Sequence, residues 1–213
     1  AADDALTIKG IADTQTITLS GDLGGGANTV TVAPDAAAVA ITTIDLSGLS
    51  ATGGTLSGTI TIDKALTAVS SIKGSAGNDT ITIGKVNDGL TVTGGAGNDV
   101  FNVTAAKIVT ADTPEHATIA DFSAGDSIKF AASVTAYKHS TVDLSGKADL
   151  KSAIAAVLTD SDEATTVYGF TYNNESYLYY NVATAAANDV LVKLTGTTVN
   201  LDSLATSTND IVF

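Results

Sequence analysis

Aspartates that end glycine-rich loops are the residues of this sequence with the clearest potential for chemistry. Residues 74–82 read GSAGNDTIT and residues 94–102 read GGAGNDVFN, so Asp79 and Asp99 occupy the same place in two nonapeptides. A degenerate copy between them keeps Asp88 in register. Glycine supplies left-handed backbone dihedrals that larger residues resist. Stacked loops of this kind would present carboxylates and backbone carbonyls to a shared point, and such hard oxygen ligands suit calcium.

The residues after each loop predict the strands that must position it. Ile81, Leu90 and Phe101 each lie two residues after an aspartate, in the middle of a three-residue extended segment. We expect these apolar side chains to point into a core rather than to line a cofactor site. Two nonapeptides then make one coil, which places the loops before Asp79 and Asp99 on the same side of the coil.

Residues 1–72 alternate apolar residues with threonine, a period of two that indicates half-buried strands. Turn-forming residues at 45–49 and 52–54 are expected to interrupt them. The loop at 24–29 echoes the nonapeptide but has no aspartate, so we expect it to turn without binding metal. The expected strands are 14–19, 29–32, 40–44 and 59–62. Many short strands with a loose repeat favour a β-solenoid over a β-sandwich.

The composition excludes several classes of protein. The chain has 213 residues, 10 lysines and no arginine, 20 aspartates and 3 glutamates, and a formal net charge of −13. Phosphates would be repelled, so no nucleic-acid partner is expected. The absence of cysteine excludes disulfides and thiolate metal sites. No apolar run approaches the ~18 residues of a membrane span. The sequence opens on alanine with no signal-peptide pattern, and we expect it to begin inside a longer protein.

Beyond residue 102 the nonapeptides give way to a different set of elements. The segment 120–130, ADFSAGDSIKF, carries Asp121 and Asp126. The chain then predicts a helix at 149–158, a hairpin of 165–172 and 176–182, and strands at 189–194 and 198–201. We therefore expect a β-solenoid over residues 1–110 and a β-rich C-terminal cap over residues 111–213, with the boundary between residues 103 and 120. The cap would cover the open last coil.

The repeats resemble the Gly-Gly-x-Gly-x-Asp-x-apolar-x nonapeptides of the RTX (repeats-in-toxin) proteins, which bind calcium. The segment at 120–130 resembles the Asp-Phe-x-x-Gly-Asp sequence that follows the last repeat in many of them. The match spans about 57 residues, and Ser75 departs from it by replacing the second glycine. The resemblance implies a parallel β-roll with Ca²⁺ as cofactor. The metal-site residues that it implies are Gly74, Ala76, Asp79, Asp88, Gly94, Ala96, Asp99, Asp121 and Asp126.

The bacterial surface-layer (S-layer) and adhesin-type members of this group are the most similar in their threonine, alanine and aspartate content. The resemblance implies export by type I secretion and folding outside the cell as calcium binds. The last residues, Asp210, Ile211, Val212 and Phe213, resemble the extreme C-terminal motif of many type I substrates. The alternative is that they form the last strand of the cap.

Other interpretations of the acidic residues stay open at this point. Asp79 and Asp99 would otherwise cap turns, as Asx residues do. Asp88 has no in-register carboxylate two nonapeptides away, and Asp121 and Asp126 either complete a terminal site or cap turns. The acidic run at 160–163 either binds a cation or forms a solvated loop. The tyrosines at 168, 172, 177, 179 and 180 form either a sugar-binding strip or cross-strand packing.

Three classes of function follow. The first is a non-catalytic structural and secretion module of a secreted S-layer-like protein. Its partners would be other copies of the parent protein, a cell-surface glycan or lipopolysaccharide, and the type I exporter. The second is the non-catalytic tail of a secreted RTX lipase or protease. The third is a solenoid enzyme acting on acidic polysaccharide, which two scattered histidines and the lack of arginine disfavour. The first class is preferred, and no catalysis is expected.

Overall fold

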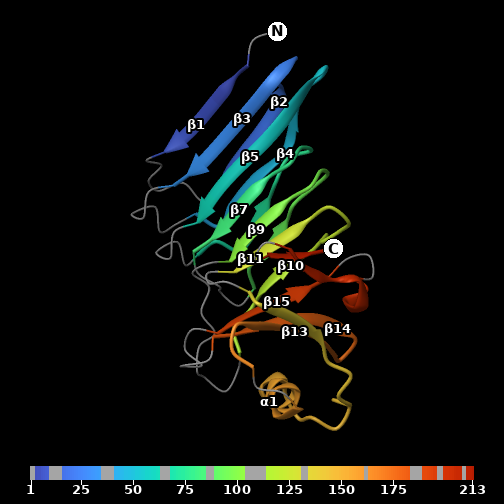
Figure 1. Cartoon of the computed structure of the whole chain (residues 1–213). Helices are drawn as coiled ribbons and strands as arrows, with labels where there is room; N and C mark the ends of the chain where they lie inside the picture. The colour runs from blue at the N-terminus through green and yellow to red at the C-terminus, as the bar shows by residue number, and fades with distance from the viewer. Residues whose placement is uncertain are drawn as a thin grey trace.

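The structure, a computed structural model, is a two-sided parallel β-solenoid of about five turns that ends in a β-rich cap. Figure 1 shows the coils stacked from the N-terminus, with strands β13 and β14 and helix α1 at the far end. The predicted mainly-β solenoid is confirmed. The structure describes residues 3–9, 16–34, 41–62, 68–84, 89–103, 114–130, 134–160, 163–182, 189–195, 199–207 and 210–213.

From β1 to β11 the chain alternates between two sheets as it winds, so successive strands lie on opposite faces of the coil. Parallel pairing within each sheet joins one coil to the next. The first sheet runs in the order β1 (Ala5–Lys9), β3 (Gly26–Ala33), β5 (Gly54–Ile62), β7 (Thr80–Ile83), β9 (Val100–Val103), β11 (Ser127–Phe130), β17 (Asp210–Val212) and β16 (Ala205–Ser207). The second runs in the order β12 (Ala136–His139), β13 (Thr166–Tyr172), β14 (Glu175–Asn181), β15 (Val190–Leu194), β10 (Ala117–Ile119), β8 (Thr91–Thr93), β6 (Ser71–Lys73), β4 (Thr43–Ser50) and β2 (Thr16–Asp22).

Columns of apolar side chains between the two sheets hold the coils together. Strand register aligns Val32, Ile60, Ile81, Phe101 and Ile128 in the first sheet, and all five are buried. A column of Ile17, Ile44, Ile72, Val92 and Ile119 faces them from the second sheet. Each coil buries one member of each column, so stability depends on stacking rather than on any single coil.

The cap extends both sheets, with β11, β17 and β16 paired antiparallel in the first and β13, β14 and β15 paired antiparallel in the second, where β15 joins β10 and β12 joins β13 in parallel. The hairpin of β13 and β14 turns at Asn173 and Asn174, whose φ angles of 51° and 62° match a type I′ turn. Helix α1 (Leu150–Asp160) packs on one face of this hairpin and closes a second apolar core. Asp149 and Ser152 begin the helix with reciprocal hydrogen bonds, a capping box. The predicted helix, hairpin and strand at 189–194 are confirmed.

Two local predictions are wrong. Residues 45–49 lie inside strand β4 rather than in a turn, because Asp45 accepts hydrogen bonds from the Ser47 amide and hydroxyl without bending the chain away from β2 and β6. Residues 199–201 do not form a strand. The 3₁₀ helix η2 (Leu201–Ser203) begins at Leu201, because the Asn200 side chain accepts a hydrogen bond from the Asp202 amide.

The predicted boundary at residue 110 lies outside the described residues and stays a prediction. On its C-terminal side, β10 and β11 still pair in parallel with β8 and β9. Within the described residues, no helix has the length and apolar character that crossing a bilayer requires.

Candidate functional site

A column of buried carboxylates runs along one edge of the solenoid, where the loops enter the first sheet. Asp79, Asp99 and Asp126 each lie one residue before a strand, and the register of β7, β9 and β11 stacks them on successive coils. All three are at least 97% buried. Burying a charged group is unfavourable unless it is hydrogen-bonded or paired, so the partners of each carboxylate decide what this column can do.

Hydrogen bonds run along the column in one direction. The Asp79 amide donates to Asp99 Oδ1 at 2.8 Å, and the Asp99 amide donates to Asp126 Oδ1 at 2.8 Å. The Gly58 amide donates to Asp79 Oδ1 in the same way. Each aspartate therefore satisfies a backbone donor of the coil before it.

Asp79 is fully engaged by protein groups. Its Oδ2 accepts the Ser75 amide, and the Ser75 hydroxyl lies 2.9 Å from Oδ1 and 3.1 Å from Oδ2. Asp126 has a similar partner, because both the amide and the hydroxyl of Ser123 donate to its Oδ2, at 2.8 and 3.1 Å. In both cases a serine three or four residues earlier closes the loop around the carboxylate.

Asp99 is different from its two neighbours in the column. Its Oδ1 accepts the Asp79 amide, but its Oδ2 is buried and has no hydrogen-bond partner among the described residues. A carboxylate oxygen without a donor is the atom in this column that a cation would satisfy. The residues around Asp99 therefore fit a hard cation, with an anionic oxygen in a loop of small residues with exposed backbone.

The surroundings of Asp99 disfavour its ionised form. Burial raises the pKa of this carboxyl to about 7, and the nearby negative charges of Asp79, Asp126 and Asp121 act in the same direction. The hydrogen bond from the Asp79 amide opposes the shift without cancelling it. Burial also raises the pKa of Asp79, while its hydrogen bonds to Ser75 and Gly58 lower it.

Glycine is required beside these carboxylates because the backbone approaches them closely. A Cβ on Gly94 would lie 2.2 Å from Asp99 Oδ2. A Cβ on Gly74 would lie 2.2 Å from the Gly94 carbonyl oxygen and 2.4 Å from Asp79 Oδ2. Carboxylate and carbonyl oxygens of neighbouring coils thus converge on the space that a side chain would fill.

The other predicted site residues are Asp121, the loop alanines Ala76 and Ala96, and Asp88. Asp121 lies beside the second loop, where its Oδ1 and Oδ2 accept the amides of Gly94 and Gly95 at 2.8 Å each. Ala76 and Ala96 are exposed at the loop tips. Asp88 lies outside the described residues. Within the described part of the chain, no three acidic or histidine side chains gather in a group that could hold a metal, so a cation here would depend on backbone oxygens as well.

The residues that sequence reasoning missed are the uncharged partners in the column. Ser75 was noted as a departure from the repeat, but its hydrogen bonds to Asp79 were not foreseen, nor were those of Ser123 to Asp126. Asn28 also has a capping role, because its Oδ1 accepts the Asp4 amide while its Nδ2 donates to the Gly24 carbonyl. The sequence predicts a turn in this loop, but from Gly26 onward its residues lie in strand β3, and the expectation that it binds no metal stays a prediction. The signal in each case was a short polar residue close to a glycine of the loop.

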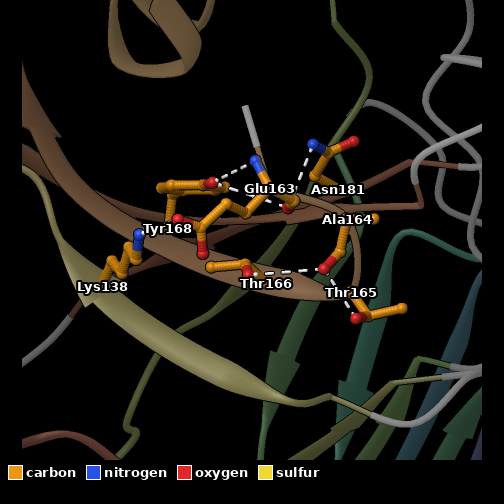
Figure 2. Close-up of polar contacts among 7 residues, drawn as sticks. All are labelled: Lys138, Glu163, Ala164, Thr165, Thr166, Tyr168 and Asn181. Carbon is orange, nitrogen blue, oxygen red and sulfur yellow. Dashed lines mark hydrogen bonds and ion pairs between the residues drawn. The ribbon is translucent and has the colours of Figure 1, made fainter. Parts of the chain in front are cut away.

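A second polar cluster closes the turn between α1 and β13 (Figure 2). The Glu163 amide donates to the Tyr168 hydroxyl at 2.8 Å, and Asn181 Nδ2 donates to the Glu163 carbonyl at 3.3 Å. Lys138 pairs with the Glu163 carboxylate at 2.6 Å near the surface, where an ion pair contributes about 1 kcal/mol or less. These contacts fix backbone, so we assign the cluster a structural role. Asp162, also in the acidic run at 160–163, lies outside the described residues.

The histidines and tyrosines pack within the cap. His139 Nδ1 lies 2.6 Å from Asp202 Oδ1, and the His116 ring meets the Tyr177 ring edge-on at 5.9 Å. Tyr168 and Tyr179 are cross-strand partners, and both are buried. The tyrosines thus form cross-strand packing rather than a surface strip. At the tip of the hairpin, a hollow of about 470 Å³ is lined by residues 142–145 and 171–174.

Two comparisons with known proteins identify no relative. No protein-family model matches the chain, and a search of curated proteins found no match.

Proposed function

We propose that this chain is a non-catalytic calcium-binding structural and secretion module of a secreted bacterial cell-surface protein of the S-layer kind. The observation that carries the proposal is the buried Asp99 Oδ2, which no donor of the described residues satisfies. The solenoid around it supports the same conclusion, since it stacks three buried carboxylates in one column.

The residues that would hold the cation are Asp99 and the backbone oxygens of the surrounding loops. Calcium supplies positive charge and accepts six to eight oxygen ligands in a flexible geometry. The chain holds Asp99 in place through the Asp79 amide and keeps the neighbouring position small through Gly94. Asp121 fixes the loop by accepting the Gly94 and Gly95 amides.

This arrangement would couple folding to calcium. In the unfolded chain each carboxylate is hydrated and separate, whereas folding buries Asp99 next to other negative charges. A ligand that binds only the folded state stabilises it by mass action, so its binding energy becomes folding energy. Extracellular calcium modules bind at about 10⁻⁴–10⁻³ M, which would keep the chain open in the cytosol and closed outside.

The test is a calcium titration of the purified chain after EDTA treatment. We expect a gain of β-type circular dichroism and a higher Tm at millimolar calcium, with magnesium much less effective. Asp99→Ala should reduce the response, whereas Asp143→Ala, at an exposed carboxylate of the cap, should leave it unchanged. Identical spectra and melting in calcium and in EDTA would overturn the proposal.

Export by a type I secretion system is the second part of the proposal. Asp210, Ile211, Val212 and Phe213 would be read by the exporter before folding. In the folded chain Asp210–Val212 is strand β17, with Ile211 fully buried. A signal in this segment is therefore accessible only in the unfolded chain, which agrees with an exporter that accepts unfolded substrates.

The partners that we propose on the cell surface are other copies of the parent protein in a lattice and a cell-surface glycan or lipopolysaccharide. The hollow at the tip of the hairpin favours a glycan, since its carboxylate, hydroxyl and amide groups match sugar hydroxyls. Asn174→Gly would remove an amide and keep the positive φ of the turn. Loss of surface-polysaccharide binding in this variant would support the glycan, and unchanged binding would contradict it.

The alternative is that the chain is the non-catalytic tail of a secreted RTX enzyme, such as a lipase or protease, or of an adhesin. The carboxylate column serves equally in that setting, because calcium-coupled folding is independent of what is attached. Sequence that adjoins this chain decides between the two, since catalytic motifs in it would favour the enzyme.

A further inference from the structure

The three carboxylates of the column are held in two different ways. Asp79 and Asp126 each receive the amide and the hydroxyl of a nearby serine, Ser75 and Ser123 respectively. Asp99, between them, receives one backbone amide on Oδ1 and, from the part of the chain that the structure describes, nothing on Oδ2. The three carboxylates of the column therefore differ in their hydrogen-bond partners, although the two repeats that carry Asp79 and Asp99 differ little in sequence.

The reason lies in the residue at the second position of each loop. In the first loop it is Ser75, which has no positive φ and directs both its amide and its hydroxyl to Asp79. In the second loop it is Gly95, whose φ is +109° and whose amide donates to Asp121 instead of Asp99. A Cβ on Gly95 would also lie 2.0 Å from the Ser75 carbonyl oxygen, so no serine fits there in this backbone.

Asn28 gives an independent example of a side-chain donor that satisfies a loop of this solenoid. Its Nδ2 lies within hydrogen-bond distance of three carbonyl oxygens, those of Gly24, Gly26 and Thr55, at 3.2, 3.4 and 3.3 Å. An amide group can donate to a ring of carbonyls, whereas a carboxylate in such a position needs a cation or a proton. Asn28, Ser75 and Ser123 are thus three side chains whose amide or hydroxyl satisfies a loop of this solenoid.

We propose that Ser75 and Ser123 take the place of a cation at the two outer steps of the column, so that the cation requirement of this solenoid is concentrated at Asp99. The inference rests on the proposed calcium function and specifies where in the column it acts. Loop 74–79 is then a metal-independent turn, even though its sequence is a near-copy of loop 94–99. Removing the serine hydroxyl and Cβ should convert it into a second cation-dependent step.

Isothermal titration with calcium chloride, together with melting in EDTA and in calcium, tests this inference on the whole chain. Asp99→Asn should lower the number of bound calcium ions by one and melt at the same temperature in EDTA and calcium. Asp79→Asn should lower Tm equally in both buffers and keep the calcium stoichiometry of the unchanged chain. Ser75→Gly should lower Tm in EDTA, recover most of it in calcium and bind one more ion.

Controls separate this inference from the general function. Ser145→Gly, in an exposed loop of the cap, should change neither stoichiometry nor the EDTA response. Ser75→Ala removes the hydroxyl, but alanine resists the positive φ of Gly95, so its amide stays directed at Asp79. This variant should show an intermediate EDTA sensitivity, and it tests the inference if Ser75→Gly does not fold. The inference would be overturned by equal loss of calcium binding in Asp79→Asn and Asp99→Asn. It would also be overturned if Ser75→Gly kept the calcium stoichiometry and EDTA response of the unchanged chain. Either result would leave the proposed function standing. A chain that binds no calcium at all would overturn both.

Discussion

At the residue scale, burial and the nearby negative charges of other aspartates disfavour the ionised form of Asp99, whose Oδ2 has no donor among the described residues. Its pKa is about 7 in the folded chain, against 3.8 for an ordinary aspartate. Between these two pH values the folded chain keeps a proton that the unfolded chain releases. Folding is therefore most favourable at low pH for this group, and the contribution is lost as pH rises through about 7.

The first prediction is a pH dependence with an unusual sign. In EDTA, the free energy of unfolding should fall as pH rises from about 4 to about 8, by roughly 2–4 kcal/mol from Asp99 alone. Calcium should remove most of this slope, because it satisfies the ionised form. Thermal melting of the unchanged chain and of Asp99→Asn across this pH range is the measurement, and the variant should lack the Asp99 part of the slope in EDTA.

Carboxylates with lowered pKa values make the free energy of unfolding rise with pH, opposite to the effect of Asp99. The quantity to compare is therefore the difference in unfolding free energy between the unchanged chain and Asp99→Asn at each pH. Hydrogen bonds from Thr52 lower the pKa of Asp22, and those from Ser145 lower the pKa of Asp143. Their contributions are common to both proteins and cancel. Parallel pH curves for the unchanged chain and Asp99→Asn would show that Asp99 titrates normally.

The second prediction concerns the contact between backbone and carboxylate. Gly94→Ala would place a Cβ 2.2 Å from Asp99 Oδ2 and 2.9 Å from Phe101 Cζ, so we expect a loss of about 1–3 kcal/mol. Gly146→Ala is the matched control, since a Cβ there meets nothing within 4 Å. Urea unfolding in calcium measures both, and equal midpoints would contradict the packing at Gly94.

At the element scale, the stability of each coil comes from the apolar residue that it contributes to the core. Phe101 is fully buried, and its ring centroid lies 6.3 Å from that of Phe122, which precedes β11. Leu6 in β1 is 41% exposed, although its register partner Val30 is buried. An apolar residue of β9 therefore contributes more to the stability of the fold than an apolar residue of β1.

The third prediction follows from this difference. Phe101→Ala should destabilise the chain by about 3–5 kcal/mol, since a large buried side chain leaves a cavity when truncated. Leu6→Ala should change the stability by less than about 1 kcal/mol, because much of that side chain is already in water. Chemical denaturation in the presence of calcium compares the two, and a similar loss in both would contradict the assigned burial.

Period-two alternation was sufficient to predict most strands, because inward and outward positions of a solenoid differ sharply in polarity. It failed at residues 45–49, where Asp45, Ser47 and Gly48 look like a turn but occupy a strand with a register shift opposite Thr18 and Ser20. The nonapeptide spacing predicts Asp79 and Asp99 as site residues, and the resemblance to RTX proteins adds Asp121 and Asp126. Their hydrogen-bond partners were not predicted, because Ser75 stands where the repeat has glycine, and the bonds that Asp121 accepts from the Gly94 and Gly95 amides depend on how one coil sits on the next.

At the scale of the whole molecule, the C-terminal residues close the solenoid by pairing against its last coil. Strand β17 pairs antiparallel with β11, where Ile211 opposes Ile128 and Lys129 lies 3.7 Å from the Asp210 carboxylate. Phe213 packs edge-on against Phe122 at 6.0 Å. The predicted last strand is confirmed, while the export signal in the same residues stays a prediction. One segment would then serve the exporter when unfolded and the fold when secreted.

The fourth prediction separates these two roles of residues 210–213. Deleting them exposes Ile128 and Phe122, so the truncated chain should melt well below the full chain in calcium, by the equivalent of about 2–5 kcal/mol for the loss of a buried Ile side chain.

Loss of export in the deleted chain would have two explanations, the loss of the export signal and the loss of strand β17. A short polar extension after Phe213 avoids the ambiguity, because β17 and its pairing with β11 stay intact while the motif no longer ends the chain. We expect the extended chain to melt like the unchanged one and to accumulate in the cytosol of an exporting strain. Normal extracellular yield of the deleted or the extended chain would contradict the signal and leave β17 with a structural role alone.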